Sequence, residues 1–298
     1  MSILARTIKV GGAHVIEPIG KPPMQKRAVV CHYHLYKNSG TSFSALLREN
    51  FGERHVEFDG PIASFQINQD QLAEIVESNS EILSVSSHQI YLPAPSTLNV
   101  HFIPVMILRH PMLRIRSIYL FENQVGDASF LGEDISLLLQ GFEKWARDRL
   151  ATQSGLISLS NLQTNQLSRA YCRAPQMDIR DKACFYDLDL AINNLKLVSC
   201  IARTEHYADD IAHFGATLAD YGLAFDSDLG KPENVSASDF DKAPEDQLET
   251  FKSSMTRDLW QELCRINSQD QALYDAASTL IQVRAKRGGR AGSAFDDF

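Results

Sequence analysis

The sequence has no long apolar run and no excess of positive charge. No stretch reaches the roughly 18 apolar residues that a membrane-spanning helix needs, and the N-terminal residues lack the sustained apolar core of a secretory signal. The formal net charge is −8, which argues against broad nucleic-acid binding because such binding depends on a basic face. These features predict a cytoplasmic protein without a transmembrane segment or a nucleic-acid partner, while peripheral contact with a membrane stays open.

Cysteine is also scarce. The five cysteines are irregularly spaced and none belongs to a Cys-x-x-Cys pair, which argues against a zinc knuckle. Cys172 and Cys184 are near enough in sequence to pair across a loop. Reduced thiols are nevertheless the favoured interpretation for a cytoplasmic protein.

The chain has the composition of an ordinary globular protein, with 44% hydrophobic and 22% charged residues in 298 positions. Apolar runs that predict buried strands alternate with patterns that predict helices, and this alternation is typical of a parallel sheet. We therefore expect an α/β protein of three layers, a P-loop-like fold with a central parallel sheet flanked by helices. The predicted strands are 27–34, 57–59, 82–86, 102–108 and 195–201; the predicted helices are 41–51, 70–78, 112–123, 134–150, 161–170, 188–194, 208–221, 256–266 and 269–285.

The domain organisation follows from the same pattern. Residues 1–285 are expected to form one domain that begins with an extended lead-in, and the glycine-rich residues 286–298 are expected to be a disordered tail. The polar segment 226–249 predicts a loop, and whether it forms a lid over a substrate stays open.

The segment Lys37-Asn38-Ser39-Gly40-Thr41-Ser42 lies between a predicted strand and a predicted helix. In such a turn, free backbone N–H groups and the helix dipole favour an anion, and a lysine adds a mobile positive charge. The lysine precedes the glycine, so the loop is not a Walker A motif. The pattern predicts a phosphate site; the alternative is a structural junction with an incidental lysine.

A second motif runs from Arg109 to Tyr119 as Arg-His-Pro-x-x-Arg-x-x-Ser-x-Tyr. Arg109 ends a buried strand, where a charge is costly unless it is paired, and Ser117 follows two turns into the next helix. An arginine fork with a hydroxyl suits a second phosphate. Alternatively, Arg114 and Arg116 form a solvated helix face, which is the favoured interpretation for Arg116.

Histidine and arginine side chains stand at other strand ends. His88 follows a buried strand, and histidine titrates near neutral pH, as a general base should; a hydrogen-bonded structural role is the alternative. Arg203 ends a late strand and suits either a nucleotide or an anionic acceptor. Because ligands of parallel sheets bind beyond the carboxyl ends of the strands, we expect these residues to converge with Lys37 and Arg109.

Other polar residues near the first strands receive weaker assignments. His32 and His34 share one side of the strand before the loop, where a role in the core or behind the site is favoured. Glu57 and Asp59 follow the first helix, and a surface role is favoured there over contact with an acceptor.

Two phosphate sites on adjacent strand ends suit a nucleotide with phosphates at both ends of its ribose, and here the chain resembles the sulfotransferase superfamily. The similarity is to the carbohydrate sulfotransferase branch, which includes heparan 2-O- and chondroitin-type enzymes. Residues 37–42 match its 5′-phosphosulfate loop, and residues 109–119 match its 3′-phosphate motif. Segments 161–167, 202–207 and 267–274 resemble three further motifs, with Arg203 and His206 as departures. The chain therefore resembles a distant, bacterial-type member.

The resemblance implies a donor, 3′-phosphoadenosine 5′-phosphosulfate (PAPS), and in-line transfer of its sulfuryl group to a hydroxyl of a saccharide or glycoconjugate such as a glycolipid. By the same resemblance, Lys37 stabilises the leaving phosphate, His88 takes the acceptor proton and no metal is needed. The product is adenosine 3′,5′-bisphosphate (PAP). The residues assigned to the nucleotide are Lys37, Asn38, Ser39, Gly40, Thr41, Ser42, Arg109, Ser117 and Arg203.

Two other classes stay open. A P-loop kinase or NTPase needs a lysine after the glycine turn and an acidic Mg²⁺ ligand at a strand end, and neither is apparent in the sequence. A non-catalytic nucleotide-binding protein on the same scaffold predicts donor binding without turnover and indifference to His88→Ala.

Overall fold

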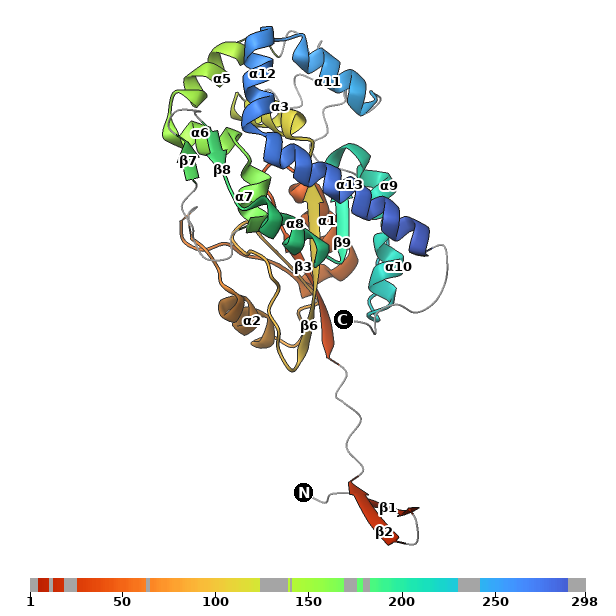
Figure 1. The fold of residues 1–298 in the computed structure, drawn as a ribbon. Helices are drawn as coiled ribbons and strands as arrows, with labels where there is room; N and C mark the ends of the chain where they lie inside the picture. The colour runs from red at the N-terminus through yellow and green to blue at the C-terminus, as the bar shows by residue number, and fades with distance from the viewer. Residues whose placement is uncertain are drawn as a thin grey trace.

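The sheet at the centre of the molecule has five parallel strands in the order β4-β5-β3-β6-β9. Of these strands, β3, β6 and β9 are labelled in Figure 1. The computed structural model describes residues 5–10, 13–18, 26–62, 65–123, 139, 141–168, 176–178, 183–229 and 242–288. The strands are β3 (Arg27–Tyr33), β4 (His55–Glu57), β5 (Ser84–Ser87), β6 (Val100–Leu108) and β9 (Cys200–Arg203). This arrangement confirms the predicted α/β fold with a central parallel sheet flanked by helices.

Helices connect the strands and cover both faces of the sheet. They are α1 (Gly40–Phe51), α2 (Gln69–Glu77), α3 (Pro111–Glu122), α5 (Phe142–Leu150), α6 (Gln153–Leu159), α7 (Leu162–Ser168), α8 (Leu188–Lys196), α9 (Tyr207–Ile211), α10 (Phe214–Ala219), α11 (Pro244–Lys252), α12 (Arg257–Ile266) and α13 (Ser268–Gly288). Short 3-10 turns, η1 (Gly52–Arg54) and η3 (Thr204–His206), follow α1 and β9. Two antiparallel pairs complete the described structure: β1 (Ala5–Val10) with β2 (Ala13–Pro18), and β7 (Gln176–Asp178) with β8 (Ala183–Phe185).

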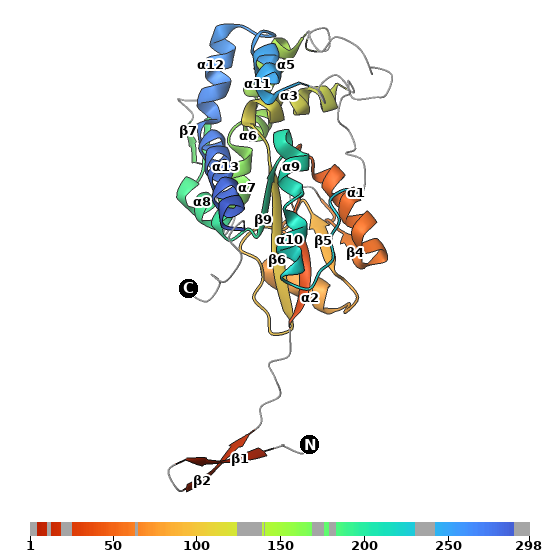
Figure 2. The same ribbon diagram turned by 90° about the vertical axis from the view of Figure 1, so that its right-hand side faces the viewer.

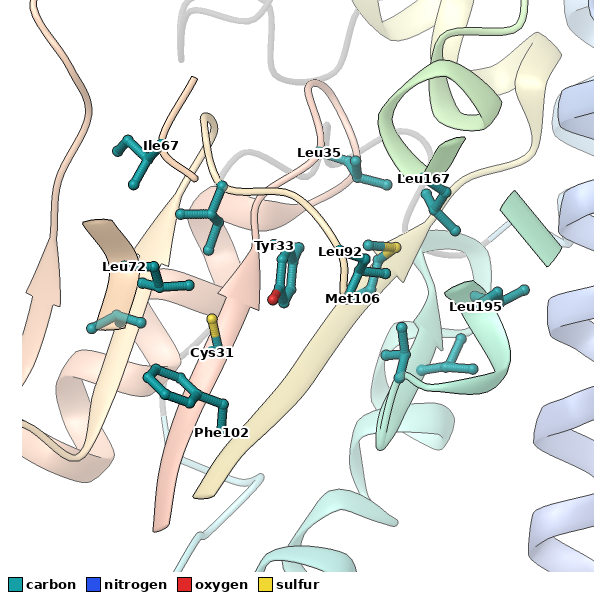
Figure 3. Close-up of a cluster of buried hydrophobic side chains, with 14 of the residues drawn as sticks. Cys31, Tyr33, Leu35, Ile67, Leu72, Leu92, Phe102, Met106, Leu167 and Leu195 are labelled. Carbon is teal, nitrogen blue, oxygen red and sulfur yellow. The ribbon is translucent and has the colours of Figure 1, made fainter. Parts of the chain in front are cut away.

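The period of two along the central strands explains the three layers. Cys31, Tyr33 and Met106 face a core shared with Leu72 of α2 and Leu195 of α8 (Figure 3). The alternate residues of β3 and β6 face a second core, which is shared with α1, α9 and α10. Figure 2 shows α1, α9 and α10 on one side of the sheet and α7, α8 and α13 on the other. Since both faces are covered, β3 and β6 are buried along almost their whole length and mostly apolar, as parallel strands usually are, whereas the buried strand β5 carries three serines.

A third hydrophobic core lies beyond the end of the sheet toward which the strands run (Figure 1). It joins α3, α5, α6, α11 and α12 through fully buried residues such as Phe142, Phe251 and Leu259. The carboxyl ends of the strands therefore meet a helical lobe.

Several predicted boundaries are wrong. The predicted strand 195–201 begins only at Cys200, because α8 continues through Lys196 and buries Leu195 as a helical residue. A short apolar run does not separate a strand from the buried end of a helix. Within 226–249, the predicted loop is helical from Pro244, where proline opens α11 and Glu245 and Asp246 follow in its first turn.

Other expectations are only partly matched. The predicted helix 208–221 is two short helices, α9 and α10, and the helix predicted over 134–150 is described from Phe142 only. The lead-in contains the β1–β2 pair, and α6 and the β7–β8 pair were not predicted. Cys184 has a free, buried thiol, while Cys172 and residues 230–241 lie outside the described residues. The first three residues of the predicted tail 286–298 are helical, because α13 continues to Gly288, and the rest of that tail lies outside the described residues.

We expect Ile103→Ala to lower the free energy of unfolding by about 2–5 kcal/mol, because Ile103 is fully buried in β6 and its loss leaves a cavity. Leu98 is 87% exposed, so Leu98→Ala should change the same quantity by about 0.5 kcal/mol or less. Urea denaturation of both variants measures the difference. Equal losses in the two variants would contradict the position of β6 inside the sheet, between β3 and β9.

Candidate functional site

The loop between β3 and α1 has the backbone geometry of an anion cradle. Lys37 and Ser39 have φ values of 63° and 59°, in the left-handed region that side chains rarely adopt. Turns with left-handed residues can bring backbone N–H groups together as an anion site, although the N–H of Asn38 donates within the loop to the carbonyl of Leu35 at 3.4 Å. Ser39 occupies the N-cap of α1 without a capping side-chain bond, and the first turn of a helix holds no acceptor for its own N–H groups. Left-handed residues of this kind concentrate at functional sites.

Gly40 begins α1 in direct contact with the ring of His34. A Cβ atom placed on Gly40 would lie 1.9 Å from Cδ2 of His34, far inside van der Waals contact. Glycine is therefore required here by the close approach of an imidazole and not by its own φ angle.

Three histidines stack beside this loop. The ring centroid of His34 lies 5.1 Å from that of His32 and 3.7 Å from that of His88. Burial, and secondarily the charge of His88, lowers the pKa of His34 to about 3. Burial lowers the pKa of His32 well below its ordinary value, and its Nδ1 lies 2.9 Å from Oγ of Ser86. Both rings are thus neutral near pH 7 and form an uncharged support for His88.

The exposed side chain of His88 is held in one tautomer. Its Nδ1 lies 2.8 Å from the backbone carbonyl oxygen of His34. Since a carbonyl only accepts, Nδ1 carries the hydrogen, so in the neutral ring the lone pair is on Nε2. The backbone N–H of His88 donates to Oδ1 of Asp59 at 2.9 Å, and the Ser87 hydroxyl donates to the same oxygen at 2.8 Å. The arrangement presents Nε2 as a proton acceptor.

A cavity of about 270 Å³ lies between α1 and the carboxyl ends of β4 and β5. It brings Thr41 of the loop and His88 to the same space. Glu57, whose carboxylate pairs with Arg48, and Asp59 also line it, and both residues are exposed, as the favoured surface role predicts. No local pattern pointed to Ser44, Arg48 or Phe58, because these residues become neighbours only through the packing of α1 on the sheet. The complete lining is His34, Thr41, Ser44, Arg48, Glu57, Phe58, Asp59, Ser86, Ser87 and His88.

The two predicted phosphate motifs, residues 37–42 and 109–119, touch each other. Nη1 of Arg109 donates to the backbone carbonyl oxygen of Lys37 at 3.1 Å. On its other side, Nε of Arg109 lies 3.8 Å from Oε1 of Glu205. The guanidinium thus lies directly behind the loop, and Ser117 is half-buried on the second turn of the following helix.

Lys37 is partly withdrawn from water. Its Nζ lies 4.0 Å from the centroid of the Phe121 ring, an arrangement typical of a cation–π contact. Burial, and secondarily the charge of Arg109, lowers the pKa of Lys37 to about 8. The ammonium is therefore charged at neutral pH and less strongly hydrated than an exposed one.

Two of the predicted nucleotide ligands are used within the protein. The buried side chain of Asn38 donates to the carbonyl of Ile107 at 3.0 Å and to Oε1 of Gln163 at 2.7 Å, so it supports the loop from behind. Arg203 forms two hydrogen bonds of 2.9 Å with the carboxylate of Asp210. This pair, which raises the pKa of Arg203, fixes the junction of β9 and α9.

The alternative of a solvated helix face for Arg114 and Arg116 is wrong, since both side chains are buried. Nη2 of Arg114 donates to the carbonyl of Ser158 at 3.1 Å. Burial lowers the pKa of Arg114, and the negative charge of Asp270 opposes that shift. The helical lobe around the third core buries the arginine side chains of α3. The local sequence pattern of α3 could not indicate this burial, because the covering helices come from later in the chain.

Within the described residues, no group of three or more His, Cys, Asp and Glu side chains is arranged to hold a metal ion. Of the helices described, none is both long enough and apolar enough to cross a bilayer.

Comparison with known proteins adds one relative. No family model matches the chain. A protein of Archaeoglobus fulgidus described as "Uncharacterized protein" is 25% identical over 252 residues, which are 84% of this chain and 95% of that protein. The similarity covers most of both chains but brings no activity with it.

We expect Gly40→Ala to lower the free energy of unfolding by about 1–3 kcal/mol, because its methyl group meets the stacked ring of His34. Replacing the ring as well, in His34→Ala/Gly40→Ala, should make the combined loss smaller than the sum of the single losses. Chemical denaturation of the three variants tests this. Strict additivity would show that the imidazole is not what excludes a side chain at position 40.

Proposed function

We propose that this protein is a sulfotransferase that moves a sulfuryl group from PAPS to a hydroxyl of an acceptor, with a saccharide or glycoconjugate as the acceptor class. The single observation that carries the proposal is the contact between the two phosphate motifs, in which Arg109 binds the carbonyl of Lys37. A nucleotide with phosphates on both sides of its ribose needs two such sites side by side. The composition supports a cytoplasmic location.

The donor would bind across this contact. The N–H groups at the start of α1 suit the 5′-phosphate, and Arg109 with Ser117 suits the 3′-phosphate. The leaving group is a phosphate whose negative charge grows as the sulfur–oxygen bond breaks. The partly desolvated cation of Lys37 is suited to stabilise that charge, since electrostatic stabilisation is strongest where water is excluded.

The acceptor would occupy the cavity beside His88. As the acceptor oxygen attacks sulfur, its proton passes to Nε2 of His88, the nitrogen that the carbonyl of His34 leaves with a lone pair. The cavity offers hydroxyls, carboxylates and an aromatic ring from Phe58. Such a mixture suits a polyol, which both donates and accepts hydrogen bonds and has an apolar face.

Titration calorimetry with PAP tests the donor site without knowledge of the acceptor. We expect saturable binding that Arg109→Ala weakens by roughly tenfold to a hundredfold, because a charged hydrogen bond is lost. Lys37→Ala should weaken PAP binding much less, yet slow PAP release from PAPS by roughly a hundredfold or more in the presence of an oligosaccharide panel. An absence of PAP binding by the unmodified protein, or binding of Mg²⁺-ATP instead, would contradict the proposal.

The base is tested by His88→Gln. We expect transfer to fall by roughly 10²–10⁴-fold while PAP affinity is retained, because the base acts on the acceptor and not on the nucleotide. The matched control is His101→Gln: His101 is exposed near the start of β6, at the opposite edge of the sheet, where it stacks on Tyr221. Full activity of His88→Gln would remove His88 from the mechanism, and PAP binding without turnover in the unmodified protein would favour a non-catalytic nucleotide-binding protein.

A further inference from the structure

We propose that Gln163 is a positioning residue that fixes the spacing between the two phosphate motifs, an inference that rests on the proposed function. Gln163 is 2% exposed and belongs to α7, outside both motifs. Its side chain reaches both of them, and Figure 1 shows α7 beside the upper part of β6. No part of its side chain needs to touch the nucleotide for this role.

The amide of Gln163 holds three groups at once. Its Oε1 accepts from the backbone N–H of Arg109 at 2.9 Å and from Nδ2 of Asn38 at 2.7 Å. Its Nε2 donates to the backbone carbonyl of Arg109 at 2.8 Å. One planar group thereby joins the backbone of the 3′-phosphate motif to the side chain that supports the 5′-phosphate loop. Only an amide supplies this combination of acceptor and donor at that length.

Gln163 is itself held in a rigid frame. The buried carboxylate of Asp270, at the start of α13, accepts from the backbone N–H groups of Gln163 at 3.1 Å and Thr164 at 2.7 Å. The backbone N–H of Asp270 in turn donates to Oδ1 of Asn161 at 3.1 Å. The amide therefore has little freedom to follow a movement of either motif.

The spacing matters because PAP is a ligand with two anchors. Once one phosphate is bound, the second site acts at a high effective concentration only if it lies at the matching distance. Loosening the link should therefore leave each site able to bind one phosphate while removing the advantage of binding both. A general loss of stability would instead weaken the binding of PAP and of each adenosine monophosphate by the same factor.

The test compares Gln163→Met with Gln269→Met. Gln269 is a matched control, because its amide holds the backbone N–H and carbonyl of Tyr186 in the same way, at 2.9 and 2.8 Å, and Tyr186 belongs to neither motif. Calorimetric titration of each full-length variant uses three probes: PAP, adenosine 5′-monophosphate and adenosine 3′-monophosphate.

We expect Gln163→Met to weaken PAP binding by about tenfold or more and to change the affinity for either monophosphate by about twofold or less. Gln269→Met should leave the ratio of PAP affinity to monophosphate affinity unchanged. Equal weakening of all three ligands by Gln163→Met, or no change in any, would overturn the positioning role while leaving the donor assignment intact. Failure of the unmodified protein to bind PAP would overturn the donor assignment and this inference together.

Two further variants keep the test decisive if Gln163→Met does not fold. Gln163→Glu keeps the size and the acceptor but loses the donor to the carbonyl of Arg109, so it should lower the same affinity ratio. Asn38→Ala breaks the link from the loop side. If the two residues act through one another, Gln163→Glu/Asn38→Ala should lower PAP affinity by less than the product of the two single effects. Independent effects would contradict a shared link.

Discussion

The parallel pairing of β3 with β6 is the constraint on which the site depends. These strands pair from Arg27 with Val100 to Tyr33 with Met106, so both end at the same edge of the sheet. The loop that follows β3 and the arginine that follows β6 are thereby brought together, although more than seventy positions separate them. A shift of this register by one residue would place Tyr33 and Met106 on opposite faces of the sheet and displace the two motifs relative to each other.

The sequence predicted the features that depend on local pattern. The start of α1, the proline that opens α3 and the apolar strands were visible because turn chemistry and periodicity act over a few residues. The burial of Arg114 was not visible, because it is caused by helices far along the chain. Likewise, the cavity beside His88 requires α1 to pack next to β4, and no short pattern encodes that contact.

Hydrogen bonds join three segments whose resemblance to family motifs was weak, 161–167, 202–207 and 267–274, into one frame. Asn161 and Gln163 meet Asp270, and the hydroxyl of Tyr274 donates to Glu205 at 3.0 Å. Glu205 also accepts from the backbone N–H of His110 at 3.1 Å, directly after Arg109. Buried polar residues of this kind are costly unless every partner is present, so the frame specifies one arrangement of the strand ends.

The position of α13 has a consequence for the order in which the protein is made. Asp270 and Tyr274 lie near the start of this 21-residue helix, long after both phosphate motifs in the chain. Further along the helix, Arg284 donates to the carbonyls of Val198 and Ser199, just ahead of β9. A nascent chain that has already released its first strands from the ribosome still lacks these supports. The loop between β3 and α1 therefore becomes fully braced only after translation has passed α13, and a prematurely terminated chain would carry the two predicted motifs without their frame.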